Sequence, residues 1–315
     1  MYRQELDILK GILIICVVMG HTKGVSIPYI DVFWFHMPAF FLVSGLVNKN
    51  WGIDKESLKK RFLRQCVPYF AYCLVFWGLF HVESLEKYLV RIVYGGSMNT
   101  TAFTYPFWFI NSLFVTQIIY SWIKRKSLFL YSVPGGGKWL ILSVVLCYIA
   151  IHLKSIYLPK VFPLPWAIDN SIGAIVFLYL GDLFKRYQFR SWHITLVLIP
   201  ILFTWVNSVF AWDYQINMKS MVYNHWLLDL LIPCSFSFVL YLGCLALKRI
   251  FFVNSLLAYV GQCSITIFFT HVVFLHYTDG YLPAVQVFIA LTGGIIVHAI
   301  SNQNRFTRFL FIGKK

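Results

Sequence analysis

Ten apolar stretches recur along the chain, and they constrain its fold more than any other feature. They cover residues 5–22, 32–48, 67–85, 106–123, 139–153, 166–184, 192–211, 225–247, 255–275 and 281–300. Crossing a bilayer core of about 30 Å takes about 20 apolar helical residues. Only 12% of the residues are charged, about half the share found in soluble domains. The sequence therefore predicts an all-α polytopic membrane protein with about ten transmembrane helices, and it excludes a soluble enzyme.

The formal net charge of +15 is explained by topology. With a cytoplasmic N-terminus, an even number of spans places both termini in the cytoplasm. The predicted cytoplasmic segments, which include the loops near 55, 125, 188 and 249, then hold 21 of the 27 Lys and Arg residues. This is the positive-inside pattern, so no nucleic-acid partner is needed. We expect residues 1–315 to form a single membrane-embedded domain.

Three ionisable residues of the first stretch share one helix face, which is costly in a membrane and therefore indicates function. Asp7 and Lys10 are three residues apart and can pair. Lys10 and His21 are separated by almost three helical turns, so they point the same way about 16 Å apart along the axis. We expect the ion pair near the cytoplasmic boundary and the imidazole part-way across the membrane. The alternative is a Lys that extends to the interface and a His satisfied by a neighbouring helix.

The second stretch carries another imidazole, His36, followed directly by Met37-Pro38 and later by Ser44-Gly45. If this helix runs inward from the outer face, His36 lies at a depth comparable with His21, and the two rings can share one site. An imidazole titrates near neutrality, so it can take a proton from a hydroxyl and return it. Ser44-Gly45 permits close helix packing. The residue spacing does not support a metal site.

At this point the motifs resemble a known family. Asp7-x-x-Lys10-Gly11-Ile12, Gly20-His21, Phe35-His36-Met37-Pro38 and Ser44-Gly45 resemble the acyltransferase-3 family of integral membrane O-acyltransferases, in particular its fucose 4-O-acetylase-like branch. Weaker matches continue in the family's order to about residue 275: Arg61-x-x-Arg64, Pro106-x-Trp108-Phe109, Asp169 with Gly181, and Gly261-x-x-Ser264 followed by His271. Many members have Arg where this chain has Lys10. A lysine keeps the positive charge but cannot make the two parallel hydrogen bonds of a guanidinium group.

The resemblance implies an enzyme of the bacterial inner membrane. It would move an acyl group, usually acetyl from acetyl-CoA, to a sugar hydroxyl of a surface polysaccharide or its lipid-linked precursor, without a metal. Relatives that transfer succinyl share these motifs. We predict His21 as the general base, His36 as its orienting partner or oxyanion donor, and Asp7 with Lys10 as residues that fix the first helix. Direct transfer and a transient acyl-His both stay open.

Basic residues after the second stretch offer a landing site for the polyanionic acyl-CoA, and we assign Lys60, Arg61 and Arg64 to it. The alternative role of this cluster is to set topology. Trp108, Asp169, Ser264 and His271 are predicted to line the substrate cavity, although helix-to-helix contacts would look the same. The competing function is a glycolipid or polysaccharide transporter or flippase. The absence of an internal repeat and of broken-helix pairs in the sequence argues against it.

Overall fold

The computed structural model describes residues 4–81, 83–98, 101–130, 136–158, 163–185, 195–210, 212 and 214–314. Its elements fall into two compact units. Unit 1 comprises residues 1–43, 187–217 and 224–300, and unit 2 comprises residues 44–186, 218–223 and 301–315. The predicted cytoplasmic loop near 188 and residues 192–194 of the seventh stretch lie outside the described residues.

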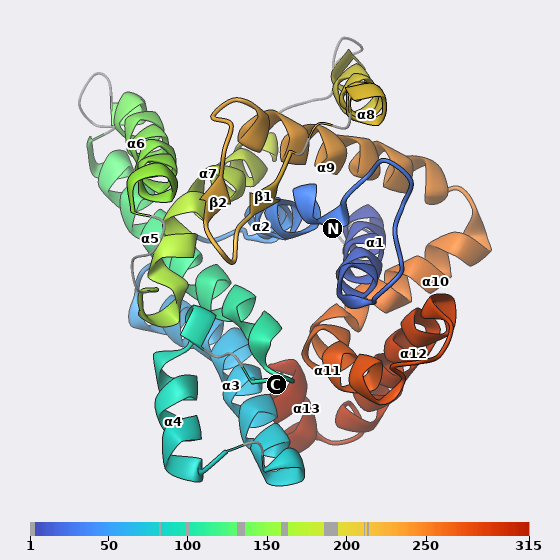
Figure 1. Cartoon of the computed structure of the whole chain (residues 1–315). Coiled ribbons are helices and arrows are strands. Elements are labelled where there is room, and N and C mark those ends of the chain that lie inside the picture. The colour runs from blue at the N-terminus through green and yellow to red at the C-terminus, as the bar shows by residue number, and fades with distance from the viewer. Residues whose placement is uncertain are drawn as a thin grey trace. The chain divides into compact units, whose positions relative to one another are not determined.

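Unit 1 is built around the first helix. Its elements are α1 (Gln4–His21), η1 (Val32–Trp34), the start of α2 (His36–Val47), α8 (Leu198–Phe210), β1 (Ile216–Asn217), α9 (Leu228–Leu247), α10 (Phe251–Gln262), α11 (Ser264–Tyr277) and α12 (Pro283–Ser301). α1 packs along α10 and also contacts α9 and α11 (Figure 1). The core is apolar, and Ile8, Leu9 and Leu13 of α1 are fully buried.

Two glycines allow α1 and α10 to approach closely. A Cβ at Gly11 would clash with the carbonyl oxygen of Leu257, and one at Gly261 would clash with that of Asp7. Small residues at such a crossing bring two backbones together, which stabilises helix pairs in membranes. The glycines of the first and last family motifs therefore meet at one crossing.

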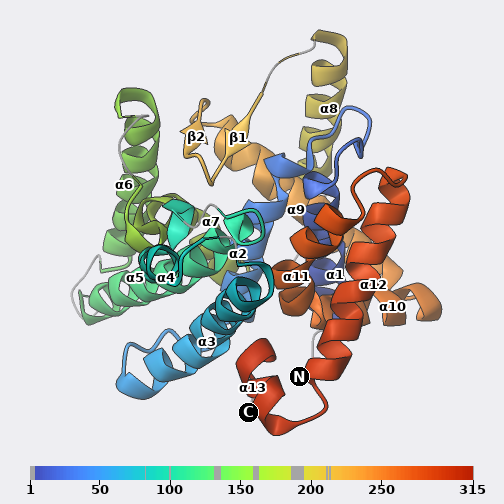
Figure 2. The ribbon, with the colours of Figure 1, turned by 60° about the horizontal axis from the view of Figure 1, so that its bottom comes forward.

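Unit 2 holds the end of α2, α3 (Lys55–Phe80), α4 (Leu85–Tyr94), η2 (Gly96–Met98), η3 (Tyr105–Phe107), α5 (Trp108–Leu130), α6 (Gly136–Tyr157), η4 (Pro165–Ala167), α7 (Ile168–Phe184), β2 (Val222–Tyr223) and α13 (Arg305–Ile312). α5, α6 and α7 pack on one another, and α13 lies against α3 (Figure 2). Gly45 makes the close contact expected of Ser44-Gly45, since a Cβ there would clash with the carbonyl oxygen of Leu178.

Helices lie at all ten predicted stretches, but their lengths differ from expectation. Within the described residues, four helices are long and apolar enough to cross a membrane, at Gly137–Tyr157, Pro165–Phe184, Leu228–Leu247 and Pro283–Ser301, and α10 with α11 would make a fifth. α2 has 12 residues, which span about 18 Å, and α8 has 13. The chain is an all-α membrane protein, and the count of ten spans stays a prediction.

Three local features were not predicted. The ninth stretch is broken, because α10 and α11 meet at Cys263 with a bend of 78°. Helix α4 follows the third stretch. Helix α13 follows the last stretch.

At the start of α3 the Asp54 carboxylate caps the helix, and hydrogen bonds from Ser57 hold the pKa of this carboxyl below the usual range.

Apolar side chains are exposed on several helices of both units. On α6 they include Leu142, Leu146 and Leu153, and on α12 they include Phe288 and Ile296. Patches of this kind are unfavourable in water and natural against lipid. They support the assignment of these helices to a membrane.

Candidate functional site

A cluster of imidazole rings lies at the C-terminal end of α1. His21 is the last residue of that helix. Its depth in the membrane stays a prediction. The centroid of its ring lies 5.2 Å from that of His271 on α11 and 6.1 Å from that of Phe33. The Phe33 ring in turn lies 5.1 Å from the ring of His36. The structure therefore brings His21, His36 and His271 into one set of linked rings within unit 1.

The protonation pattern of the two buried imidazoles follows from their hydrogen bonds. His36 and His271 have relative exposures of 1% and 0%. Nδ1 of His36 contacts the carbonyl oxygen of Val32, and Nδ1 of His271 lies 2.7 Å from that of Phe268. A carbonyl can only accept, so each Nδ1 carries a proton, and in the neutral form of the ring Nε2 is then the unprotonated nitrogen. This arrangement favours His36 as a proton acceptor and weakens the expectation that it donates to an oxyanion.

The Nε2 atom of His271 is buried and has no hydrogen-bond partner among the described residues. Such an atom costs free energy unless a ligand, a water or a moving neighbour satisfies it. The His271 ring also lies beside the His21 ring, at an interplanar angle of 33°. The substrate-lining role predicted for His271 stays a prediction.

The ion pair expected on α1 is present. Lys10 Nζ contacts the Asp7 carboxylate one turn away, and Asp7 is buried beside the Gly11–Gly261 crossing. The same end of α1 is tied to the far part of the chain by the pair between Glu5 and Lys248 at 3.1 Å. Asp7 and Lys10 thus lie near the N-terminal end of the helix that carries His21 at its other end.

Ser264 opens α11 immediately after the bend at Cys263. It precedes His271 by seven residues, or two helical turns, so both occupy one face of α11. The adjacent Thr266 hydroxyl pairs with Nδ1 of His298 at 3.0 Å. This bond gives His298 a packing role, in agreement with the absence of a motif around it.

Trp108 and Asp169 belong to unit 2 and are both buried. Trp108 is the first residue of α5. The Asp169 carboxylate is occupied by Lys154 Nζ at 2.8 Å and by the backbone N–H groups of Leu164 and Asn170 at 3.1 and 3.0 Å. These bonds fasten the start of α7, which favours the helix-contact alternative for Asp169.

The basic residues assigned to the acyl donor separate into two environments within unit 2. Arg61 is buried, donates to the carbonyl oxygen of Asn50 at 3.1 Å, and lies over the Trp51 ring. Lys60 and Arg64 instead line a cavity of about 680 Å³, whose other lining residues are Glu56, Lys59, Leu63, Gly313 and Lys314. Four cationic side chains and one carboxylate make this cavity suited to an anion.

α13 completes that cavity. Its C-cap, Gly313, has φ +68°, and a Cβ there would come within 2.5 Å of the Arg64 carbonyl oxygen. From the sequence, the basic residues near the C-terminus indicated topology alone. The short amphipathic run from Arg305 to Ile312 was the available sign that this segment folds back onto α3.

A buried charge cluster around Asp182 was also missed. Its carboxylate accepts from Tyr120 at 2.8 Å, from the Trp51 indole at 2.9 Å and from Lys185 at 3.0 Å, and it contacts Lys124. Three segments of unit 2 that were predicted to be cytoplasmic, near residues 51, 124 and 185, are thereby held together. An acidic residue within an apolar stretch was the available signal.

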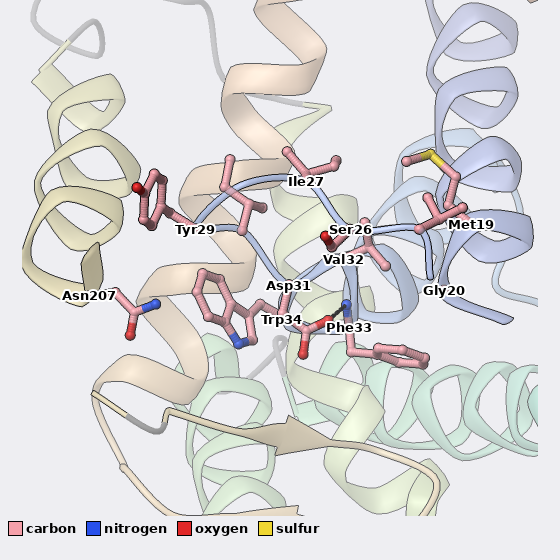
Figure 3. A pocket seen from close by; sticks show the side chains of 12 residues that line it. Met19, Gly20, Ser26, Ile27, Tyr29, Asp31, Val32, Phe33, Trp34 and Asn207 are labelled. Carbon is pink, nitrogen blue, oxygen red and sulfur yellow. Dashed lines mark hydrogen bonds between the residues drawn. The ribbon is translucent and has the colours of Figure 1, made fainter. Parts of the chain in front are cut away.

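A second cavity, of about 300 Å³, lies in unit 1 between the end of α1, the loop before η1 and α8 (Figure 3). Gly20, the residue before His21, lines it together with Phe33. The cavity therefore shares a wall with the imidazole cluster. No group of three or more His, Cys, Asp or Glu residues in the described ranges could hold a metal ion.

Comparisons with known proteins identify the family of this chain. An acyltransferase domain model matches residues 3–311, so the chain belongs to the acyltransferase-3 family. The chain is also similar to the nodulation protein NolL of Mesorhizobium japonicum, with 26% identity over 134 residues. That match covers 36% of this chain and 34% of NolL, so it spans about a third of the relative. No solved structure matches the chain. The fucose 4-O-acetylase-like branch stays a prediction.

Proposed function

We propose that this protein transfers an acyl group, most simply acetyl from acetyl-CoA, to a sugar hydroxyl of a bacterial surface polysaccharide or its lipid-linked precursor. The observation that carries the proposal is the imidazole cluster of His21, His36 and His271 at the end of α1. Membership of an acyltransferase family supplies the reaction class. The similarity to NolL, a nodulation protein, does not specify a substrate.

The proposed reaction needs one base and no metal. We favour His21 as the base. Its imidazole Nε2 takes the proton of the sugar hydroxyl while the hydroxyl oxygen attacks the thioester carbon. The tetrahedral intermediate then collapses, the C–S bond breaks, and the proton passes to the departing thiolate. A positioned base of this kind contributes roughly 10²–10⁴-fold to the rate. His36 and His271 present lone pairs that can orient the base or replace it.

We assign the anionic part of the donor to the cavity of Lys59, Lys60, Arg64 and Lys314. The phosphates of coenzyme A carry several negative charges, which four cations attract. Arg61 is no longer assigned to the donor site, because its guanidinium already donates hydrogen bonds to backbone carbonyls. The donor would thus bind on the side predicted to be cytoplasmic, where coenzyme A is available.

Contacts inside each unit support the proposed topology. In unit 1, Glu5 pairs with Lys248, so the N-terminal end of α1 lies beside the junction of α9 and α10. At the other end of α1, Lys23 pairs with Asp279. Each pair joins segments that the charge pattern assigned to one side of the inner membrane. Ten spans and two cytoplasmic termini are part of this proposal.

The experiment is a transfer assay with purified full-length protein in nanodiscs. Radiolabelled acetyl-CoA and the surface glycan extracted from a deletion strain are supplied, and labelled ester on the glycan is measured by mass spectrometry and scintillation. Transfer by the wild-type protein that is lost in His21→Ala supports the proposal. Absence of transfer from acetyl-CoA and succinyl-CoA alike contradicts it.

Transport of a glycolipid is the second candidate, and one observation favours it. The bend of 78° between α10 and α11 is the kind of broken helix that transporters use at substrate sites. Transporters built from repeats carry such breaks in corresponding pairs, whereas the described residues contain one bent pair. A flipping assay with fluorescent glycolipid in proteoliposomes, run without acyl-CoA, separates the two functions.

A further inference from the structure

The cavity of about 300 Å³ in unit 1 differs in chemistry from the basic cavity of unit 2. Its polar and aromatic lining consists of Ser26, Tyr29, Asp31, Phe33, Trp34 and Asn207 (Figure 3). Among the described residues, the lining contains one carboxylate and no Lys or Arg. A polyanionic ligand such as coenzyme A is therefore disfavoured there, whereas a neutral ligand rich in hydroxyl groups is not.

Two polar groups in this cavity retain hydrogen-bonding capacity. The Oδ1 atom of Asn207, on α8, is buried without a partner among the described residues. Asp31 uses Oδ1 to accept the Phe33 N–H at 2.8 Å, and the Asp31 residue lines the same space. Buried polar atoms are normally satisfied, so an unpaired one beside a cavity indicates a missing ligand or water.

Aromatic rings complete the lining. Trp34 is held in place because its indole N–H donates to the Tyr214 carbonyl oxygen at 3.0 Å, and Tyr29 is 63% exposed at the rim. A fixed aromatic surface beside amide and carboxylate groups suits a pyranose ring, which has apolar faces and hydroxyls around its edge. The volume, near the lower end for ligand sites, suits a ligand of about one ring.

The position of the cavity links it to the chemistry. Phe33 forms part of its wall, and the Phe33 ring contacts both His21 and His36. Gly20 brings the backbone next to His21 into the same wall, and a Cβ there would press on Val32 at 3.1 Å. A ligand in the cavity is thus separated from the imidazoles by one aromatic side chain.

We propose that this cavity binds a neutral pyranose ring of the acyl acceptor, with Asp31 and Asn207 contacting its hydroxyls. The inference rests on the proposed acyl transfer, since it names where that reaction takes its acceptor. The cavity lies at the end of α1 opposite the Glu5–Lys248 pair, on the side where the charge pattern places the outer face.

The kinetic test uses Asn207→Leu, a near-isosteric change that removes the amide. The probes are acetyl-CoA as donor and methyl β-D-glucopyranoside, methyl β-D-galactopyranoside or 1,4-butanediol as acceptor. We expect the KM for a methyl glycoside to rise about tenfold, while the KM for acetyl-CoA and transfer to butanediol change less than twofold. Ser208→Ala, the adjacent position outside the lining, is the matched control and leaves every constant unchanged.

The binding test needs no donor. Cysteine is introduced as Ser26→Cys inside the cavity or as Ser208→Cys outside it, and maleimide labelling is followed at each position by peptide mass spectrometry. We expect a methyl glycoside to slow labelling at position 26 at least fivefold and to leave position 208 unaffected. The wild-type background controls for the native cysteines, of which Cys147 and Cys234 are only partly buried.

The two measurements separate this inference from the function on which it rests. Protection at position 26 without acyl transfer to any acceptor supports the sugar cavity and contradicts the proposed function. Acyl transfer without protection, and with an unchanged glycoside KM in Asn207→Leu, supports the function and overturns the sugar cavity.

Discussion

The imidazole rings of His21 and His271 lie 5.2 Å apart, although 250 positions separate them in the chain. We predict that His21→Ala lowers acyl transfer per inserted molecule at least 100-fold, because a positioned base contributes roughly 10²–10⁴ to the rate. The measurement is labelled glycan ester normalised to membrane-inserted protein. His276→Ala, an exposed histidine on α11, is the control and keeps near wild-type activity. Retention of more than a tenth of the activity in His21→Ala removes this residue as the base.

His271 provides a second prediction. His271→Leu removes the unpaired Nε2, and we expect kcat to fall about tenfold with little change in either KM, because His271 acts through His21 and not on substrate binding. His271→Gln offers a side-chain oxygen near the position of Nε2 and should recover part of kcat. Steady-state kinetics on both variants check this. A rise in KM with constant kcat would instead return His271 to the substrate-lining role.

The crossing of α1 and α10 gives a stability prediction. Gly261→Ala places a methyl group against the Asp7 carbonyl oxygen, and overpacking of this kind costs about 1–3 kcal/mol. Thermal unfolding in detergent, followed by tryptophan fluorescence, should show a lower midpoint. Gly243→Ala on α9 is the control, since nothing lies within 4 Å of its added Cβ and alanine is the better helix former. Equal midpoints for the two variants would show that the crossing is not tight.

Arg61 and Arg64 should behave differently despite their shared motif. Arg64→Gln removes a cation from the basic cavity, so we expect the KM for acetyl-CoA to rise several-fold, an effect that weakens at high salt. Arg61→Gln breaks bonds to two backbone carbonyls and should lower the amount of folded protein. Donor titrations and size-exclusion profiles of the two variants are the measurements. If Arg61→Gln and Arg64→Gln change the kinetics equally and Arg61→Gln stays fully folded, the two residues do not have the different roles expected here.

Topology can be tested at the two ends of unit 1. A cysteine at Lys23 or Asp279 should react with an impermeant maleimide added to spheroplasts, because the ion pair between these residues lies on the predicted outer side. A cysteine at Lys248 should react only after the membrane is opened. Labelling of position 248 in intact spheroplasts would reverse the orientation.

Local periodicity accounts for what was predictable in the site. The spacing of Asp7, Lys10 and His21 depends on one helix, and both the helix and the Asp7–Lys10 pair are present. Periodicity could not predict that His271 lies near His21, because this contact depends on how a distant helix bends at Cys263. Similarly, the periodicity of α3 places Arg61 and Arg64 on neighbouring faces, but only the packed structure shows that carbonyl groups surround the first.

In the fold, too, features set by local sequence were predictable and features set by packing were not. Hydropathy located the apolar helices because their burial in lipid follows from composition alone. It missed α4 and α13, which are short and amphipathic and gain their stability from neighbours in unit 2. It also did not find the break at Cys263, because the whole stretch is apolar enough on average to be predicted as one continuous span, although Gln262 and Ser264 flank the break.

The contact between Gly11 and Gly261 has a consequence for how the protein is made. α1 leaves the ribosome about 250 residues before its main packing partner, α10. At roughly 5–20 residues per second, α1 must wait for tens of seconds with its charged Asp7–Lys10 pair uncovered. Biogenesis of unit 1 is therefore a late event, and truncated chains that end before α10 will hold an unassembled first helix that quality-control proteases can recognise.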